Sequence, residues 1–282
     1  MIRAVLGVAL ALLSCAAHAM FSGSIVDAAF VAKAVARGAI VWDVRGPEAY
    51  FDGHVPGAVS LPALDVLVEE RTQMLRPAER IAAQLGAAGI DLKREIVVYG
   101  AAADTAAYFT QFALEYMGAR NVHVFHQGIS GWRAAKRPVS TAPVKPRAVK
   151  VRPFANPAML ATTGEVIARA TKGDVQFLDV RRRAEFDGDE SETPLGGHIP
   201  GAIHIPYDAV LVEAGGALRT RAAMKKIYAP LDPRKEVIVY DHVGLRAAMT
   251  ASILARLGYH SVRLYLPGWF EYGNVADAPV EQ

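Results

Sequence analysis

The chain has 282 residues, of which 52% are hydrophobic and 21% are charged, so its length suits two ordinary domains with well-supported buried cores. Its 31 basic and 28 acidic residues give a formal net charge of +3 without a dense Lys/Arg block. This balance argues against a nucleic-acid-binding protein.

Residues 1–19 are typical of a secretory signal peptide. Arg3 precedes an apolar stretch over residues 4–13, and Ala17-His18-Ala19 matches the small-x-small pattern of a cleavage site. The apolar stretch is too short for a comfortable membrane span. We therefore predict an exported protein, periplasmic or secreted.

Cys15 is the only cysteine of the chain, and it lies inside this leader. Leu12-Leu13-Ser14-Cys15 loosely matches the lipoprotein pattern that acylates a cysteine, so a lipid anchor is the alternative to simple cleavage. Both routes leave the mature chain without a thiol or a disulfide, and its stability then depends on packing.

An internal repeat organises the chain after residue 24. Three pairs of segments recur at an offset of about 140 residues: 41–45 with 177–181, 53–58 with 197–202, and 95–99 with 236–240. Short apolar strands alternate with helical stretches in each copy, which predicts an α/β fold with a parallel sheet flanked by helices. We predict domains over residues 24–138 and 158–282, joined by a proline-rich, basic, semi-extended linker over 139–157.

The second copy contains a turn that connects a predicted strand to a predicted helix. Val237-Ile238-Val239-Tyr240 is the predicted strand, and residues 246–257 form the predicted helix. Backbone N–H groups in such a turn, together with the helix N-terminus, favour negative charge. A thiolate at the first loop position would have a lowered pKa. This chain has Asp241 there instead.

These motifs, in this order and duplicated, resemble a tandem-domain rhodanese of the thiosulfate or mercaptopyruvate sulfurtransferase group. The resemblance covers almost the whole chain after the leader. The matching motifs are Asp179-Val180-Arg181, Glu185-Phe186, Gly197 to Ala202, Pro206, Pro267 to Asn274 and Pro279-Val280-Glu281. The resemblance implies two rhodanese-like domains, of which the C-terminal one is normally active.

The resemblance also implies a loop of the form Cys-x-x-Gly-x-(Arg, Ser or Thr), whose thiolate carries sulfur as a persulfide between donor and acceptor. Here the loop aligns as Asp241-His242-Val243-Gly244-Leu245-Arg246, so Asp241 occupies the cysteine position. In the first copy Gly100 occupies it. A carboxylate offers no sulfur, but it can accept the same amide hydrogen bonds, with Arg246 pairing to it or to an incoming anion.

Five further residues are expected to support the loop. Asp179 and Arg181 should hold the fold by ion pairing, and His198 should be a turn and packing residue. Glu185 falls where the mercaptopyruvate branch carries an arginine for the substrate carboxylate. Trp269 should pack the domains or line a pocket mouth between them.

Metal binding by Asp241 and His242 is disfavoured, because no second His or Cys stands at ligand spacing. We expect no metal and no cofactor. The preferred function is an exported rhodanese-family protein, inactive in persulfide transfer, that binds a protein partner or a small sulfur-containing anion. One alternative is a thiosulfate sulfurtransferase that works by a non-standard route. A phosphoryl-transfer enzyme with Asp241 as nucleophile ranks last.

Overall fold

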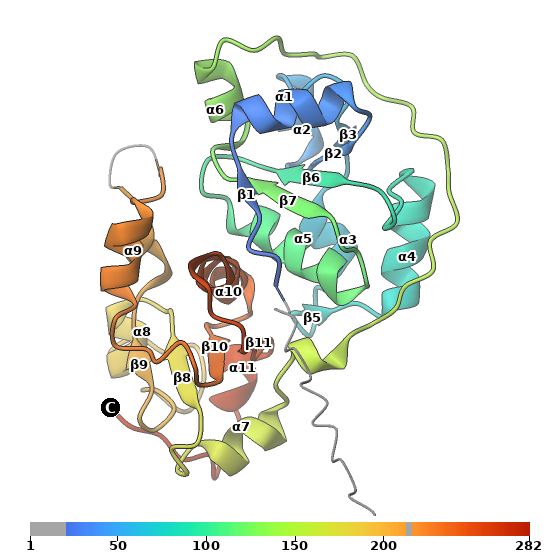
Figure 1. The fold of residues 1–282 in the computed structure, drawn as a ribbon. Coiled ribbons are helices and arrows are strands. Elements are labelled where there is room, and N and C mark those ends of the chain that lie inside the picture. The colour runs from blue at the N-terminus through green and yellow to red at the C-terminus, as the bar shows by residue number, and fades with distance from the viewer. Residues whose placement is uncertain (1–20, 213–215) are drawn as a thin grey trace, which may run out of the picture.

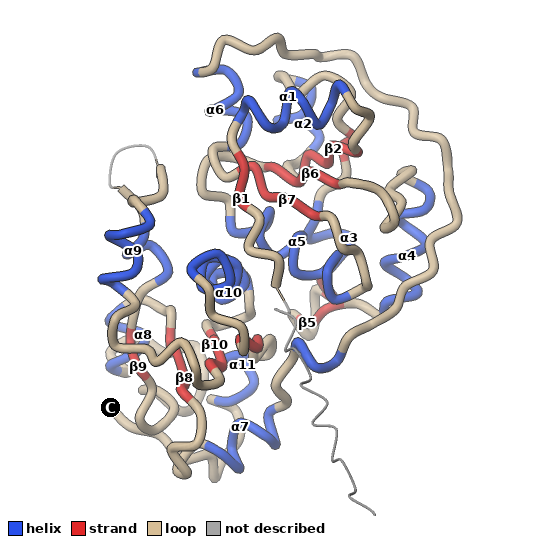
Figure 2. Tube along the Cα trace, viewed as in Figure 1, coloured by secondary structure: helices blue, strands red, loops and turns tan. Residues whose placement is uncertain are grey.

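The computed structural model describes residues 21–212 and 216–282, and it contains two α/β units (Figure 1). The predicted leader and Cys15 lie outside the described residues. Figure 2 shows strands in the middle of each unit with helices around them. Within the described residues, no helix is both long enough and apolar enough to cross a membrane.

The first unit is built on a five-stranded sheet in the order β1-β7-β6-β2-β3, with all neighbours parallel. A small antiparallel hairpin, β4-β5, lies beside it. The elements are β1 Ile25–Val26, α1 Ala28–Ala36, β2 Ile40–Asp43, α2 Pro47–Phe51, β3 Val59–Ser60, α3 Ala63–Leu67, β4 Val68–Glu69, β5 Met74–Leu75, α4 Ala78–Ala87, β6 Ile96–Tyr99, α5 Thr105–Tyr116, β7 Val122–Phe125 and α6 Gly128–Ala134.

The second unit has a four-stranded parallel sheet in the order β11-β10-β8-β9. Its elements are η1 Pro157–Met159, α7 Thr163–Arg169, β8 Gln176–Asp179, α8 Arg183–Asp187, β9 Ile203–His204, η2 Tyr207–Val210, α9 Arg221–Ile227, β10 Val237–Tyr240, α10 Leu245–Leu257, β11 Val262–Leu264 and α11 Gly268–Tyr272. The predicted α/β class with parallel sheets flanked by helices is confirmed.

The strands form where the sequence has continuous apolar runs. All four residues of β6 and all four of β10 are buried, as expected for strands of a parallel sheet covered on both faces. β10 pairs with β8 on one side and β11 on the other, so its carboxyl end opens between two neighbours. Gly258 ends α10 in the left-handed conformation, which glycine adopts readily at a helix C-cap.

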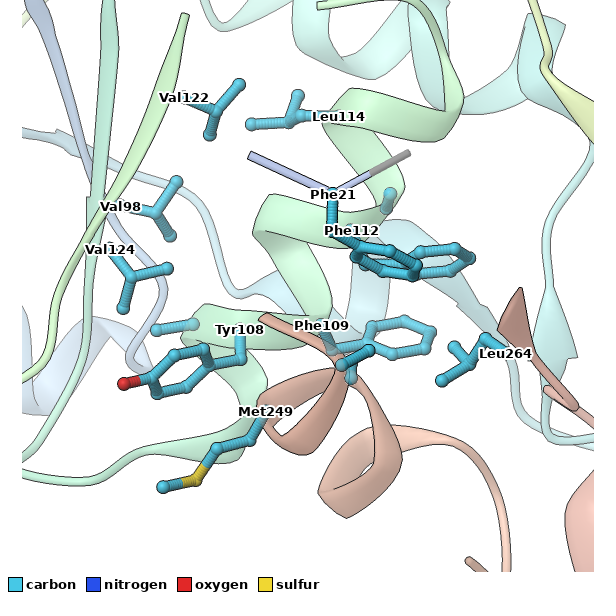
Figure 3. Close-up of a cluster of buried hydrophobic side chains, with 14 of the residues drawn as sticks. Phe21, Val98, Tyr108, Phe109, Phe112, Leu114, Val122, Val124, Met249 and Leu264 are labelled. Carbon is cyan, nitrogen blue, oxygen red and sulfur yellow. The ribbon is translucent and has the colours of Figure 1, made fainter. Parts of the chain in front are cut away.

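The two units share one apolar core, centred on the packing of α5 against α10. Figure 3 shows Tyr108 of α5 beside Met249 of α10, with Phe109 and Phe112 of α5 in the same cluster. A buried hydrogen bond of 2.8 Å, from Ser252 Oγ to Gln111 Oε1, also joins these helices. The shared core fixes the position of α10, and therefore of the loop that precedes it.

Candidate active site

The loop of residues 241–244 leaves β10 and enters α10, as predicted. Gly244 has φ of +89°, and an added Cβ would lie 2.4 Å from Leu266 Cδ1. The left-handed backbone favours glycine there. The turn bends back so that two backbone N–H groups, those of Gly244 and Arg246, converge on one side chain.

That side chain is Asp241, which is 1% exposed. Its Oδ1 accepts a hydrogen bond from Gly244 N, and its Oδ2 accepts one of 2.9 Å from Arg246 N. Arg246 Nε adds a third contact at 3.3 Å. Burial raises the pKa of the Asp241 carboxyl above its ordinary value, although Arg246 and the two amides act in the opposite direction. The Asp241 carboxyl group therefore accepts hydrogen bonds from both loop amides.

Arg246 also forms a bidentate ion pair with Glu185. Its Nη1 lies 2.8 Å from Oε2, and its Nη2 lies 2.9 Å from Oε1. Glu185 accepts two more hydrogen bonds of 3.0 Å, from the backbone N and the Nε of Arg182. Burial acts to raise the pKa of Glu185, but the hydrogen bonds from Arg246 and Arg182 lower it to about 2. Glu185 is therefore a fixed anion above the loop.

Asp179 and Arg181 form a buried pair at the end of β8. Arg181 Nη2 lies 2.7 Å from Asp179 Oδ2 and donates to Gly197 O, also at 2.7 Å. The first unit repeats this arrangement, since Arg45 pairs with Asp43 and donates to Gly53 O at 2.9 Å. A pair present in both units supports the fold around each loop.

His198 is buried and does not line the cavity described below. Its ring stacks on Phe186 with centroids 3.6 Å apart, and Nδ1 lies 2.9 Å from Phe186 O. Trp269 is 1% exposed, donates from Nε1 to Leu195 O at 3.1 Å, and carries the Arg181 guanidinium 4.3 Å above its ring. Both residues therefore hold neighbouring segments in place.

A cavity of about 390 Å³ opens beside the loop. Its lining residues are Arg181, Arg182, Glu185, Asp189, Glu190, Ser191, Glu192, His242 and Trp269. All of them belong to the second unit. Trp269 packs inside that unit, with its indole on Arg181, and the cavity that it lines does not lie between the two domains.

The acidic segment that distinguishes the second copy supplies four of these lining residues, 189–192. The residues of this segment were not predicted to belong to the site. The sequence does contain a signal for these residues, because the segment follows the Asp179-x-Arg181 motif and is absent from the first copy. Glu192 Oε2 lies 3.4 Å from His242 Nε2 across the cavity.

Two other loop residues face elsewhere. Leu245 lines a separate space of about 480 Å³ together with Leu64, Val68 and Arg76 of the first unit. Val243 is half-buried and lines neither cavity. Among residues 21–212 and 216–282, no three His, Cys, Asp or Glu side chains are grouped closely enough to hold a metal ion.

The corresponding loop of the first unit is also filled by a carboxylate. Asp104 caps α5 by accepting from Ala106 N at 2.9 Å, and its Oδ2 accepts from Ala101 N at 3.3 Å. A Cβ placed on Gly100 would lie 2.0 Å from Asp104 Oδ2. The carboxylate of Asp104 thus occupies the space that a side chain at position 100 would need.

Comparisons with known proteins place this geometry in a family context. The model of the rhodanese-like domain matches residues 27–135 and again 162–274. A thiosulfate sulfurtransferase from Corynebacterium glutamicum is 36% identical over 245 residues, covering 82% of this chain and 81% of that protein. The 3-mercaptopyruvate sulfurtransferase of Escherichia coli K12 is 28% identical over 239 residues, covering 82% and 84%.

Two solved structures share the fold. A crystal structure of a 3-mercaptopyruvate sulfotransferase from Escherichia coli aligns with a TM-score of 0.78 at 24% identity, covering 87% of this chain and 98% of that one. An anaerobic ergothioneine biosynthesis enzyme from Chlorobium limicola aligns with a TM-score of 0.82 at 24% identity, covering 92% and 70%.

Proposed function

The chain belongs to the rhodanese-like family. We propose that it is an exported member that binds a partner at the Asp241 loop and does not carry sulfur. Persulfide transfer requires a thiolate that accepts the outer sulfur of a donor. Residues 16–282 contain no cysteine, and the loop opens with an aspartate.

The observation that carries the proposal is the occupied loop. The Asp241 carboxylate accepts hydrogen bonds from Gly244 N and Arg246 N, which would otherwise face an anionic sulfur. A donor anion approaching to 4 Å from the Asp241 carboxylate would meet a repulsion of about 4 kcal/mol per unit charge at an effective dielectric near 20, of which Arg246 offsets a part. Asp241 is also an unsuitable phosphoryl nucleophile, because it is 1% exposed and both of its oxygens accept hydrogen bonds.

The charge of the cavity favours a cationic group. Its lining holds four carboxylates and two guanidinium groups. Arg181 pairs with Asp179, Arg182 with Glu190 and Arg246 with Glu185, so within the described residues Asp189 and Glu192 have no guanidinium partner. Of the two partner classes predicted from the sequence, a small anion is therefore disfavoured. The proposed partner is a protein that inserts a basic side chain between Asp189 and Glu192.

Thiocyanate formation from thiosulfate and cyanide tests the loss of sulfur transfer. We expect no turnover above background for the native chain and measurable turnover for Asp241→Cys, because the amides and Arg246 would stabilise the new thiolate. Asp241→Ser is the matched control, since it opens the loop equally without a thiol. Turnover by the native chain, or a mass gain of one sulfur atom on it after exposure to thiosulfate, would contradict the proposal.

Calorimetry tests the ligand class separately. A short peptide containing arginine should bind more tightly than the same peptide with citrulline, and thiosulfate should bind weakly. Asp189→Asn with Glu192→Gln should reduce the preference for arginine. Tight thiosulfate binding by the native chain would reject the cationic ligand.

The comparisons favour one alternative function, that of an active sulfurtransferase. The 36% identity to a thiosulfate sulfurtransferase favours an active enzyme that passes sulfane sulfur to a thiophilic acceptor by a non-covalent route. The same thiocyanate assay distinguishes it, because only this alternative expects turnover by the native chain. Export is tested by the N-terminal sequence of the protein recovered from the periplasm or medium, expected to begin at Met20.

A further inference from the structure

Six basic residues lie along the segment that joins the two units, and no acidic residue falls between Ala134 and Gly164. The six are Lys136, Arg137, Lys145, Arg147, Lys150 and Arg152. All six are exposed, and within the described residues none of their side chains takes part in an ion pair or hydrogen bond. Without them the formal charge of the chain would be −3 instead of +3. We call residues 136–154 the basic strap.

The basic strap is held in place although it has no helix or strand of its own. Figure 1 shows it running around the outer edge of the first unit, from α6 past α4. Val149 N donates to Gly86 O on α4, and Phe154 N donates to Met117 O after α5, both at 2.9 Å. Ser140 exchanges two backbone hydrogen bonds of 2.9 Å with His54.

Two glycines allow the backbone of the strap to approach the first unit closely. An added Cβ on Gly86 would lie 2.6 Å from Val149 O, and one on Gly89 would lie 2.8 Å from Arg147 O. The backbone of the strap therefore lies directly on the first unit, and its charged side chains point to solvent. The segment predicted as a semi-extended linker is irregular, but the structure fixes its course.

The C-terminal part of the strap concentrates charge beside an exposed aromatic ring. Lys145, Arg147, Lys150 and Arg152 lie within eight residues, about 25 Å of extended chain. Phe154 follows two residues later and is 79% exposed, the most exposed of the large hydrophobic side chains in the described residues. A row of cations next to an exposed aromatic ring is typical of surfaces that rest on anionic bilayers.

We propose that the basic strap docks the protein peripherally on anionic phospholipid headgroups. Lipid headgroups move laterally, so they can match a row of cations without a complementary rigid surface, and each cation near the membrane adds to the binding. Phe154 would enter the boundary between headgroups and acyl chains. Binding to an acidic protein would not be stabilised comparably by the single ring of Phe154, because no shaped recess surrounds that ring in the part of the chain that the structure describes. The proposal is independent of the Asp241 loop.

Vesicle flotation of the full chain tests this docking. Vesicles of phosphatidylcholine alone give the baseline, which includes any binding by residues 1–19, and vesicles with added phosphatidylglycerol report the charge-dependent part. We expect the native chain to prefer the anionic vesicles at low salt and to lose that preference at high salt. The quadruple change Lys145→Gln, Arg147→Gln, Lys150→Gln and Arg152→Gln should reduce the preference by about tenfold or more.

A matched control removes the same charge elsewhere. Lys172, Lys225, Lys226 and Lys235 are exposed and form no ion pair within the described residues. Their joint change to Gln should leave most of the preference intact. Phe154→Ser should weaken binding to anionic vesicles several-fold without changing the salt dependence. Thermal unfolding should be similar for all variants, because the changed side chains are exposed.

Three results would overturn the proposal. The first is no preference of the native chain for anionic vesicles at low salt. The second is an equal loss in the strap variant and the control variant, which would reflect net charge alone. The third is binding to a polyglutamate peptide without binding to anionic vesicles, which would indicate an acidic protein partner instead.

Discussion

Arg246 and Glu185 are 61 residues apart in the chain, yet they form a two-pronged ion pair with both N–O distances below 3 Å. Arg246 lies in the first turn of α10 and Glu185 lies in α8, so the pair ties the helix after β10 to the helix after β8. It also places one carboxyl group, Glu185, above another, Asp241, with a single guanidinium group between them. The loop amides and Arg246 therefore find their acceptors inside the protein, without an external anion.

Glu185→Gln should destabilise the protein by about 1–3 kcal/mol, because it removes the charged partner of a largely buried arginine. Urea unfolding measures this change. Arg183→Gln is the control, since its ion pair with Asp187 lies at the surface and its loss should cost less than about 0.5 kcal/mol. Equal effects of the two substitutions would show that the Glu185 pair is solvent-screened.

The same pair predicts a pH dependence. The pKa of Glu185 is about 2 in the folded protein, below its ordinary value, so its stabilisation is complete above pH of about 4.5 and is lost as the pH falls toward 2. After a discount for solvent screening, the native chain should lose about 1–2 kcal/mol more than Glu185→Gln over that range. Unfolding curves of both chains between neutral pH and acid check this. Parallel pH profiles would contradict it.

The raised pKa of Asp241 acts with the opposite sign. A carboxyl whose pKa is raised by folding stabilises the fold below its unfolded pKa, and this contribution is lost as the pH rises through the folded value. Asp241 is present both in the native chain and in Glu185→Gln. The difference between their unfolding free energies therefore reports Glu185 and its partners.

Asp241→Ala should empty the anion site of the loop. The variant should lose about 1–3 kcal/mol, because the Gly244 and Arg246 amides lose their acceptor. Sulfate should then bind there and raise the melting temperature of the variant more than that of the native chain. The parallel change Asp104→Ala tests the loop of the first unit, where about 1 kcal/mol of helix capping is also lost. Identical sulfate responses in native and variant chains would count against an internally occupied site.

Gly244→Ala should destabilise the fold by about 1–3 kcal/mol, mainly because alanine is strained at φ of +89°. The contact with Leu266 Cδ1 adds less, since that side chain can move. Gly164→Ala is the control: it lies in α7 with open space around its Cβ position, so a helix-favouring alanine should be neutral or stabilising. Calorimetric melting of both variants distinguishes backbone strain from a general effect of added methyl groups.

Several features of the site were predictable because they depend on local sequence. The apolar run Val237–Tyr240 specifies a buried strand, and Gly244 with the helix that follows specifies a turn whose amides converge. The duplicated Asp-x-Arg motif led to a strand-end ion pair in each unit. In each case the interacting groups lie within a few residues, or their pattern is repeated.

Other features depend on elements that are far apart in the chain. The acidic segment 189–192 was visible as an insertion, but its position beside His242 depends on how α8 and the loop after β10 face each other. The contact of Trp269 with Arg181 likewise depends on how elements that are distant in the chain pack together.

By itself, the sequence determined that this protein has two related α/β units and that no thiol follows Cys15, because hydrophobic periodicity, repetition and composition are local properties. Only the tertiary structure decided that Arg246 lies between Asp241 and Glu185, that Asp104 fills the loop of the first unit, and that the basic strap rests on Gly86 and Gly89. These contacts arise when the shared core brings separate helices and strands together, since the partner of a charge or a backbone carbonyl is set by distance in space and not by separation along the chain.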